Sequence, residues 1–368
     1  MALQDGLNQG PAHRLLAYVG QKRSILIMCH NNPDPDTIAA AFALKSIFLQ
    51  AGKRKVTIGY GGIIGRAENR QFVRRLKIDL THVREIDFRV YSVICLVDTQ
   101  PHTGNNALPQ NILPHIVIDH HPLRRESTKC PFFDVRPKYG SSSTILTEYL
   151  RELNFTVGRR LATALFYGLK TDTNELLRST VKADLDAFTF LFPKTAPRTL
   201  AAIENPSIPK SYFLKFADAI DNSIQYQDAI VSQMGKLTTP DIVGEMADFL
   251  LRMEGIRWTL CLGEYQDDLY MSVRTSRRRR MAGMTALRIV HGLGTGGGHE
   301  KAAAGKIPLK GLSPERRQEI SSIAIDRFLK IVGVNRKESK PITAPPGVQR
   351  KKPEKDVTPP TNGIPPGE

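Results

Sequence analysis

Hydrophobic and polar positions in the first half of the chain alternate between short apolar runs and longer stretches with helical spacing. The apolar runs are rich in β-branched residues and predict strands at 24–29, 55–60, 92–97 and 116–118. The longer stretches predict helices at 37–50, 68–76, 143–152 and 160–170, and Asp36 or Thr37 is the expected N-cap of the first helix. Because strands that alternate with helices usually form a parallel sheet, we expect an α/β domain.

The pattern changes at residues 193–209, where proline-rich connections precede a bridging helix at 212–219. Beyond this boundary the spacing predicts helices at 241–253 and 282–291, strands at 258–262 and 269–273, then a glycine-rich stretch at 292–299 and a further helical segment. We therefore expect a first domain at 1–195, a linker at 196–232, a smaller α/β domain at 233–334 and a disordered, proline-rich basic tail at 335–368.

Composition adds a preference for anionic partners. The 368 residues include 52 Lys and Arg against 36 Asp and Glu, a net charge of +16, which attracts polyanions such as nucleotides, RNA or anionic membranes, although a merely solvated basic surface is the alternative. The four cysteines form no Cys-x-x-Cys pair and the N-terminus shows no signal peptide, so we expect a cytoplasmic protein. No apolar run is long enough to predict a membrane span.

Polar residues with metal-binding chemistry follow the predicted strands. Four segments carry them, namely His30-Asn-Asn-Pro-Asp34-Pro-Asp36, Asp98, Asp119-His120-His121 and, after a helix, Asp172. A single Asp after a strand is usually a turn former, but ligands of open α/β sheets bind beyond the carboxyl ends of the strands. Four such segments together predict a pocket of carboxylates and imidazoles, whose clustered negative charge is costly unless cations neutralise it.

The residue types in these segments favour a particular class of cation. Mixed Asp and His ligands without Cys suit Mn²⁺, with Mg²⁺ as the alternative, more than structural Zn²⁺. The number of ligands favours two ions. Because a pair of divalent ions lowers the pKa of water and stabilises both the attacking and the leaving oxygen, the expected reaction is hydrolysis at phosphorus.

These segments resemble the DHH phosphoesterases in kind and in order. The resemblance rests on His30-Asn-Asn-Pro-Asp-Pro-Asp36, Leu96-Val-Asp-Thr99, Asp119-His-His121, Phe166-Tyr-Gly-Leu-Lys-Thr-Asp172 and, in the second domain, Gly296-Gly-Gly-His299. It implies that one ion is held by His30, Asp34 and Asp98, and the other by Asp36, Asp98, His120 and Asp172. Asp98 would bridge the ions, His121 would face the substrate phosphate, and Asp119 would orient the neighbouring imidazole. Asp98 and His121 are thus the candidate catalytic residues.

The first motif departs from the resembling family at two positions. Pro35 stands where glycine is common, and Thr37 stands where alanine is common. Proline fixes φ near −65° and would be incompatible with a position that needs positive φ. The ligands themselves are present, so we expect a variant loop, with loss of activity as the alternative.

The second domain supplies the candidates for substrate recognition. In the resembling family it forms the nucleotide side of an active site in the interdomain cleft. Gly296, Gly297, Gly298 and His299 would hold a far phosphate or sugar through backbone N–H groups, as turns of this kind can. Arg274 would clamp a phosphate bidentately, and a solvated edge-strand arginine is the alternative.

The resemblance and the short chain favour small substrates. We expect a Mn²⁺-dependent phosphodiesterase of the exoribonuclease type that hydrolyses short oligoribonucleotides, dinucleotides or cyclic dinucleotides. The alternatives are a phosphatase of adenosine 3′,5′-bisphosphate and a noncatalytic relative that binds nucleotides or RNA. A homodimer is one candidate assembly.

Overall fold

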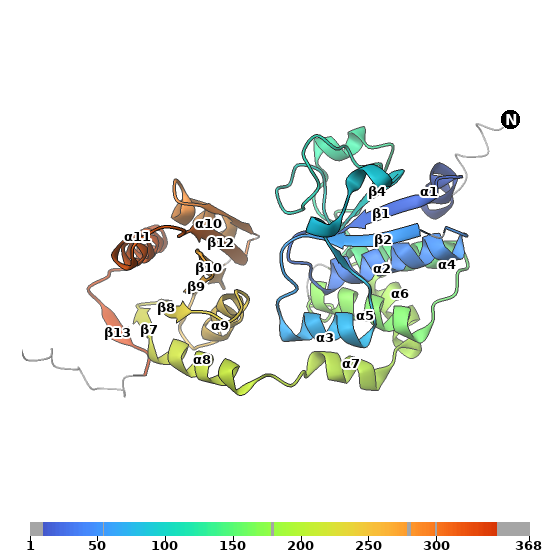
Figure 1. The fold of residues 1–368 in the computed structure, drawn as a ribbon. Helices are drawn as coiled ribbons and strands as arrows, with labels where there is room; N and C mark the ends of the chain where they lie inside the picture. The colour runs from blue at the N-terminus through green and yellow to red at the C-terminus, as the bar shows by residue number, and fades with distance from the viewer. Residues whose placement is uncertain (1–9, 54, 178–179, 278–280, 299, 344–368) are drawn as a thin grey trace, which may run out of the picture. The chain divides into compact units, whose positions relative to one another are not determined.

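The computed structural model describes residues 10–53, 55–177, 180–277, 281–298 and 300–343. The chain forms two units that divide between Ile208 and Pro209, each built around a β-sheet (Figure 1). The predicted α/β class is confirmed, with a parallel sheet in the first unit and a second, smaller sheet domain after it.

The sheet of the first unit has six parallel strands in the order β3-β2-β1-β4-β5-β6. Their bounds are β1 Ser24–Met28, β2 Lys55–Tyr60, β3 Thr81–His82, β4 Val93–Val97, β5 Ile116–Asp119 and β6 Phe132–Val135. The four predicted strands are the four innermost. The sequence did not predict β3, which has two residues, or β6, in which only Phe132 is buried, because neither carries an apolar run long enough to stand out.

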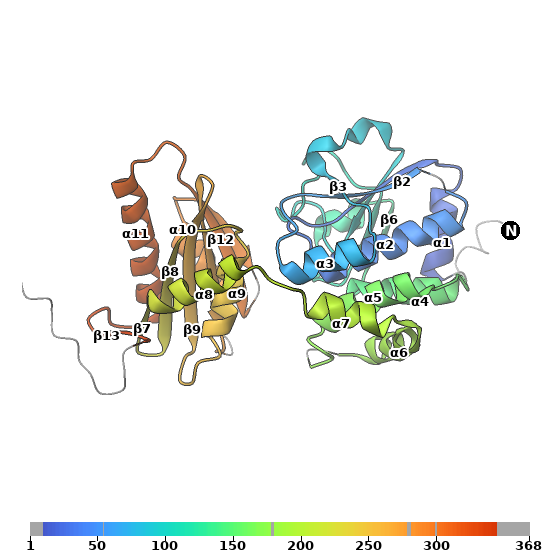
Figure 2. The ribbon, with the colours of Figure 1, turned by 60° about the horizontal axis from the view of Figure 1, so that its bottom comes forward.

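The helices of the first unit are α1 Pro11–Val19, α2 Pro35–Gln50, α3 Ala67–Arg75, α4 Ser142–Glu152, α5 Arg159–Asp172, α6 Lys182–Leu191 and α7 Pro197–Glu204, with 3₁₀ turns η1 Val83–Glu85, η2 Phe88–Val90, η3 Arg125–Lys129 and η4 Phe192–Lys194. The four predicted helices of this unit are present as α2, α3, α4 and α5, whereas α1, α6 and α7 were not predicted. Figure 2 turns α4, α5, α6 and α7 toward the viewer. Gly168 lets α5 approach α2 and α4, since a Cβ there would lie 2.6 Å from Ser143 Oγ and 3.1 Å from Asp36 Cα.

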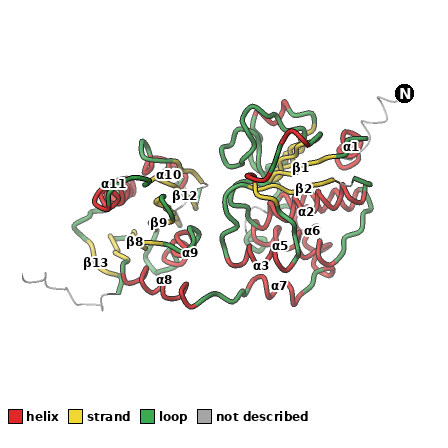
Figure 3. Tube along the Cα trace, viewed as in Figure 1, coloured by secondary structure: helices red, strands yellow, loops and turns green. Residues whose placement is uncertain are grey.

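The two faces of this sheet are covered differently. Ile25 and Ile27 face the helical layer, where α1, α2, α4 and α5 supply the core. Leu26 and Met28, which alternate with them, face a second apolar cluster formed mainly by the connecting segments between residues 83 and 130. Figure 3 shows these loops in green on one side of the strands and the helices in red on the other. Burial on both faces explains why the strands read as continuous apolar runs.

The second unit contains a seven-stranded sheet in the order β11-β12-β10-β9-β8-β7-β13, in which only β8 and β9 pair in parallel among the described strands. The elements are α8 Lys210–Asp221, β7 Ser223–Tyr226, β8 Ala229–Lys236, α9 Ile242–Leu250, β9 Trp258–Tyr265, β10 Asp268–Thr275, α10 Ala282–Val290, β11 Thr295–Gly298, β12 Ala302–Pro308, α11 Pro314–Val332 and β13 Ser339–Pro341. α10 and α11 pack on one face of the sheet, and α8 and α9 on the other.

The glycine-rich stretch differs from its expected conformation. Gly296, Gly297 and Gly298 lie in β11, and the residues after them form β12, so a β-hairpin stands between α10 and the predicted helical segment, which is α11. Three consecutive alanines at 302–304 favour a helix by propensity, but β12 pairs with β10 over its whole length and alternates buried and exposed residues. Tertiary pairing therefore overrides the local preference.

The structure also bears on the predicted linker and tail, on the cysteines and on membrane spans. The predicted linker at 196–232 contains α7, α8 and β7, and the division between the units lies within it. The predicted tail at 335–368 begins with a described strand, β13, and its residues 344–368 lie outside the described residues. The four cysteines are buried and unpaired. No helix in the described part of the chain has the length and apolar character needed to cross a bilayer.

Candidate metal centre

The candidate metal ligands lie at the carboxyl edge of the parallel sheet, where β1 and β4 are neighbours. His30 follows β1, Asp98 directly follows β4, and Asp119 is the last residue of β5. The chain runs outward from β1 through β2 to β3 and then crosses to β4 on the other side of β1, so the strand order reverses between β1 and β4. Ligands of open α/β sheets bind at this switch point, which places the three motifs where a binding site is expected.

The amino end of α2 contributes two carboxylates. Asp34 is the N-cap, and its Oδ1 accepts a hydrogen bond from the Thr37 backbone N at 3.0 Å, while its Oδ2 lies 3.6 Å from His30 Nε2. The expectation that Asp36 or Thr37 caps this helix is therefore wrong. The helix begins earlier because Pro35 occupies N1, where proline is favoured and no N–H is needed.

Both departures in the first motif fit this geometry. Pro35 lies in a helical turn, so no positive φ is required of it. Thr37 is fully buried, and its Oγ1 donates to the Val97 carbonyl at 3.1 Å, which ties the start of α2 to the end of β4. Neither residue displaces a candidate ligand.

Carboxylate and imidazole atoms converge in three overlapping groups. Within each group the ligand atoms lie within 4.8 Å of one another, and the groups are His30 with Asp34 and Asp98, Asp36 with His120 and Asp172, and Asp98 with Asp119, His120 and His121. Asp98 links the first group to the third, and His120 links the second to the third, with its Nε2 3.3 Å from Asp98 Oδ1 and 3.1 Å from Asp172 Oδ2. The structure thus brings together every residue of the first domain proposed as a ligand or catalytic group.

Backbone carbonyls orient two of the imidazoles. Nδ1 of His30 lies 2.9 Å from the Asn31 carbonyl, and Nδ1 of His120 lies 3.2 Å from the Tyr139 carbonyl. A hydrogen on each Nδ1 leaves Nε2 as the lone-pair atom, which is the arrangement of metal-binding histidines. Nε2 of His120 is buried and makes no hydrogen bond. Such an atom among carboxylates fits a cation ligand.

The amino end of α4 supports two of the carboxylates. Asp36 accepts hydrogen bonds from the backbone N atoms of Ser142 and Ser143 at 2.7 and 2.9 Å, and Ser142 Oγ donates to Asp98 Oδ1 at 2.9 Å. The sequence favoured a helix cap and a substrate contact about equally in this serine cluster, and Ser141 is the N-cap. The role of Ser142 could not be read from the sequence, because its partners are far away along the chain.

Asp98 has an unusual backbone. Its φ is 59°, in the left-handed region, and its side chain is 3% exposed. Its backbone N donates to the Ile118 carbonyl at 2.9 Å, so the residue turns out of β4 while still bonded to β5. A non-glycine residue in this region stores strain that recurs at functional sites, and here it aims the carboxylate at both His30 and His120.

Two carboxylates of the cluster have raised pKa values. Burial, together with the charges of Asp98 and Asp172, raises the pKa of Asp36 well above its ordinary value. Burial and the nearby Asp34 raise the pKa of Asp172 to about 7. Like charges in a desolvated site resist ionisation, so the cluster carries more carboxylates than its own cations can neutralise.

The same negative charge raises the pKa values of the imidazoles. Burial by itself lowers the pKa of His30 and of His120, but the adjacent carboxylates outweigh it and raise these values to about 10 and about 11. Oxygen and nitrogen donors with surplus negative charge and no sulfur are the donor set of hard to borderline divalent cations. The residues present therefore fit the expected ions.

The family of the chain follows from its two domains. Residues 24–169 match the DHH family, N-terminal domain, and residues 227–330 match the DHHA1 domain. The chain belongs to the DHH family. The first match contains all the strand-end motifs except Asp172, and the second contains Arg274 and the glycines of β11.

Two similar proteins are longer than this chain. It is 37% identical over 326 residues to an uncharacterized protein of Methanocaldococcus jannaschii, which covers 86% of this chain and 66% of that protein. It is 24% identical over 335 residues to the cyclic-di-AMP phosphodiesterase GdpP of Bacillus subtilis, covering 86% of this chain and 50% of GdpP. The chain thus spans half to about two thirds of the length of these relatives.

The fold is also similar to a solved structure. An exopolyphosphatase-related protein from Bacteroides fragilis superposes with a TM-score of 0.68 at 16% identity, and the match covers 88% of this chain and 97% of that protein. At this identity the likeness shows a shared fold.

In the DHHA1 domain the predicted substrate residues have defined positions. Arg274 lies in β10, with its Nε 2.5 Å from Asp248 Oδ1 and its Nη1 2.6 Å from Ser272 Oγ. Gly296 and Gly297 lie in the edge strand β11, and a Cβ at Gly297 would meet no atom within 4 Å. His299 lies outside the described residues.

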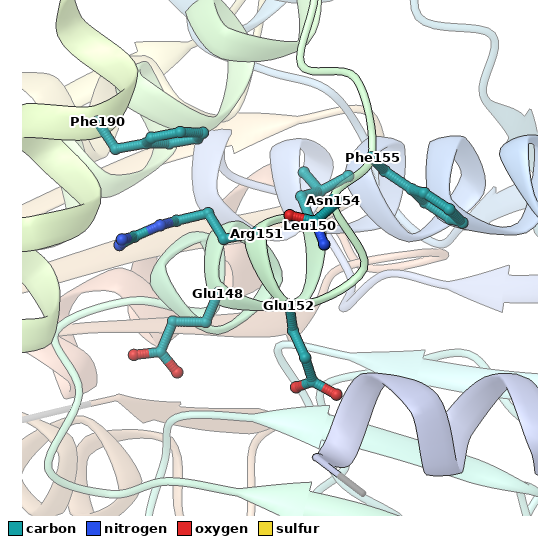
Figure 4. Close-up of a pocket in the computed structure, with 7 residues that line it drawn as sticks. All are labelled: Glu148, Leu150, Arg151, Glu152, Asn154, Phe155 and Phe190. Carbon is teal, nitrogen blue, oxygen red and sulfur yellow. The ribbon is translucent and has the colours of Figure 1, made fainter.

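A separate pocket of about 670 Å³ lies at the carboxyl end of α4 (Figure 4). Its charged groups are satisfied locally, since Glu148 pairs with Arg136, Glu152 pairs with His13, and Arg151 lies over the Phe190 ring. Asp36 and Asp98 of the metal centre contact the opposite, amino end of α4. This pocket is therefore distinct from the metal centre.

Proposed function

We propose that the chain is a metal-dependent phosphoesterase that hydrolyses short oligoribonucleotides, dinucleotides or cyclic dinucleotides. The observation that carries the proposal is the convergence of three ligand groups, linked in pairs through Asp98 or His120, at the switch point of the sheet. Two divalent ions bound by these groups would neutralise the surplus charge, activate water and stabilise the attacking and leaving oxygens. Mn²⁺ is the proposed ion, with Mg²⁺ as the alternative.

The ligands divide between the two ion positions. His30, Asp34 and Asp98 would hold one ion, and Asp36, Asp98, His120 and Asp172 the other. Asp98 is suited to bridge, because its Oδ2 lies toward His30 and its Oδ1 toward His120. The α4 amides that hold Asp36 and the hydroxyl of Ser142 that holds Asp98 keep these carboxylates in place before any ion binds.

His121 is the proposed contact to the substrate phosphate. Its side chain is 36% exposed, whereas those of His30 and His120 are 15% and 12% exposed. Nδ1 of His121 lies 2.9 Å from Asp119 Oδ1, so the opposite atom of the ring, Nε2, is directed away from Asp119. An imidazolium held in this way donates a hydrogen bond to a phosphate oxygen and can pass a proton to the leaving oxygen.

The nucleotide character of the substrate is supported by the DHHA1 domain and by the activity named for GdpP. The net charge of +16 favours anionic substrates of this kind. Arg274 and the glycines of β11 are the proposed substrate contacts in this domain. A noncatalytic relative is less favoured, since one of the two features that suggested it, Pro35, fits N1 of α2 without strain, and the other, the basic surface, suits a substrate as well as a bound ligand.

Product analysis tests the proposal directly. Purified protein with Mn²⁺ is incubated with di- to pentaribonucleotides, cyclic di-AMP and adenosine 3′,5′-bisphosphate, and nucleotides are separated by chromatography. We expect release of mononucleotides or of linearised dinucleotide. Turnover of the bisphosphate alone would support the phosphatase alternative, and unchanged ligand across the whole panel would contradict phosphoesterase activity.

Asp98→Asn is the sharpest variant for the metal assignment. Asparagine tolerates the left-handed backbone of this position and keeps its size, while the bridging charge is lost. We expect turnover to fall by at least about 1000-fold, because both ions depend on this carboxylate. The matched control is Asp186→Asn on the exposed face of α6, which should leave turnover unchanged. Substantial activity in Asp98→Asn would show that the ligand set is wrong.

A further inference from the structure

Gln100 is a buried polar residue that the ligand motifs do not include. It lies two residues after Asp98, is 1% exposed, and uses both ends of its amide. Nε2 donates to Asp119 Oδ2 at 2.7 Å and to the Pro122 carbonyl at 3.1 Å. Oε1 accepts from the Arg124 backbone N and from Ser127 Oγ, each at 2.8 Å. The amide thus makes four hydrogen bonds, which is its full capacity.

The orientation of this amide is unambiguous. An ionised Asp119 only accepts hydrogen bonds, so Nε2 of Gln100 must face it, and the Arg124 N–H only donates, so Oε1 must face Arg124. If the amide were flipped, Oε1 would face two acceptors, Asp119 Oδ2 and the Pro122 carbonyl, and Nε2 would face the Arg124 N–H, which can only donate. Gln100 can therefore hold Asp119 in one position only.

Asp119 in turn contacts both histidines that follow it. Its Oδ2 is held by Gln100, and its Oδ1 lies 2.9 Å from His121 Nδ1 and 2.8 Å from the His120 backbone N. Asp119 is itself 1% exposed, so no solvent can replace a lost donor. The path from Gln100 through Asp119 to the His121 ring consists of direct contacts.

We propose that Gln100 is a positioning residue, which acts through Asp119 to fix the ring orientation and the Nδ1–H form of His121. The same amide holds the segment from Pro122 to Ser127 beside the imidazole. Gln100 touches none of the proposed metal ligands, so its loss should spare ion binding and affect the group that faces the substrate. The kinetic part of this inference rests on the proposed function, and the spectroscopic part does not.

Long-range ¹H–¹⁵N NMR spectra of the metal-free full chain test the spectroscopic part, because they show which ring nitrogen carries hydrogen. The His121 signals are assigned by their loss in His121→Asn. At a pH where this ring is neutral, we expect wild type to show a single Nδ1–H form and Gln100→Met to show a mixture of both forms. An unchanged His121 spectrum in Gln100→Met would overturn the proposal.

Two controls separate positioning from general structural support. Ser127→Ala removes one contact of the same amide without touching Asp119, and Gln50→Met removes a glutamine that joins α2 to Thr156 at the other end of the domain. Both should keep the wild-type His121 spectrum. If Ser127→Ala changes the spectrum as Gln100→Met does, Gln100 acts only by holding the loop at residues 122–127 in place. Gln100→Asn, which keeps the amide but shortens its reach, replaces Gln100→Met if the latter does not fold.

A double-mutant cycle tests the kinetic part. In the wild-type background Gln100→Met should lower kcat by about 10- to 100-fold, the usual range for groups that orient an active-site residue, with little change in KM and in Mn²⁺ stoichiometry. In the His121→Asn background the same change should have almost no further effect, because its target is already lost. Equal losses in both backgrounds would contradict the proposal. Absence of turnover by wild type would instead count against the proposed function and leave the NMR result standing.

Discussion

At the residue scale, single side chains in the metal centre perform two tasks at once. Asp34 caps α2 through one oxygen and faces His30 with the other. Asp98 accepts from Ser142 Oγ and faces two imidazoles from a left-handed backbone. Because each oxygen already has a fixed partner, the ligand geometry exists before an ion binds, which lowers the reorganisation that binding requires.

Ion binding should release protons from these residues. In the metal-free protein the pKa values of His30 and His120 are raised to about 10 and about 11, so both rings are doubly protonated and cationic at neutral pH. A metal ligand must be deprotonated, and the affinity for Mn²⁺ should therefore rise with pH through the neutral range and level off only near these values.

Calorimetric titration with Mn²⁺ measures this release. The observed enthalpy should vary with the ionisation enthalpy of the buffer, and the slope gives the number of protons released, expected to be more than one at pH 7. Asp98→Asn serves as the control, because it should abolish the heat of binding. A slope of zero in the wild-type protein would contradict protonated imidazoles in the metal-free centre.

At the element scale, the ends of two helices matter more for the site than their lengths. The amino end of α2 supplies Asp34 and Asp36, and the amino end of α4 supplies backbone N–H groups to Asp36. Helix amino ends carry partial positive charge and unsatisfied N–H groups. They therefore stabilise carboxylates that the rest of the cluster repels.

Pro35→Gly tests whether α2 tolerates proline at its first position. Since proline at N1 restricts the unfolded chain, its replacement by glycine should lower the free energy of unfolding by about 1 kcal/mol, measured by urea denaturation. Mn²⁺ affinity and turnover should stay unchanged. Pro314→Gly at N1 of α11 is the matched control and should lose similar stability. A large gain of activity in Pro35→Gly would show that Pro35 suppresses catalysis and would favour the noncatalytic alternative.

At the scale of the whole molecule, the two units have separate apolar cores. The clusters around β1 and β4 belong to the first unit, and those around β8, β9 and β10 belong to the second. Every group of potential metal ligands found among the described residues lies in the first unit. Ion binding should therefore stabilise one unit only.

Differential scanning calorimetry of the full chain checks this expectation. We expect two transitions, of which Mn²⁺ raises only one. At free Mn²⁺ of about 100 times Kd the gain is about 2.7 kcal/mol, which shifts Tm by roughly 5 to 10 °C for a unit of this size. The shift should vanish in Asp98→Asn. A shift of both transitions would show that the second unit also depends on the ion.

Much of the fold and of the candidate site was predictable from local patterns. Burial on both faces makes β1, β4 and β5 continuous apolar runs, and metal-binding residue types stand at their ends. The elements that were not predicted, such as β3, β6 and the β11–β12 hairpin, have short, weakly patterned or misleading sequences. Their conformation depends on a neighbouring strand.

The sequence by itself therefore determined which residues can bind ions and which strands carry them, because side-chain chemistry and hydrophobic periodicity are local properties. Only the tertiary structure decided which strands are neighbours and which groups support the ligands. Ser142 reaches Asp36 across 106 positions, and Gln100 reaches Asp119 across 19. Such contacts depend on the packing of α4 and the order of the strands, and no local pattern encodes either.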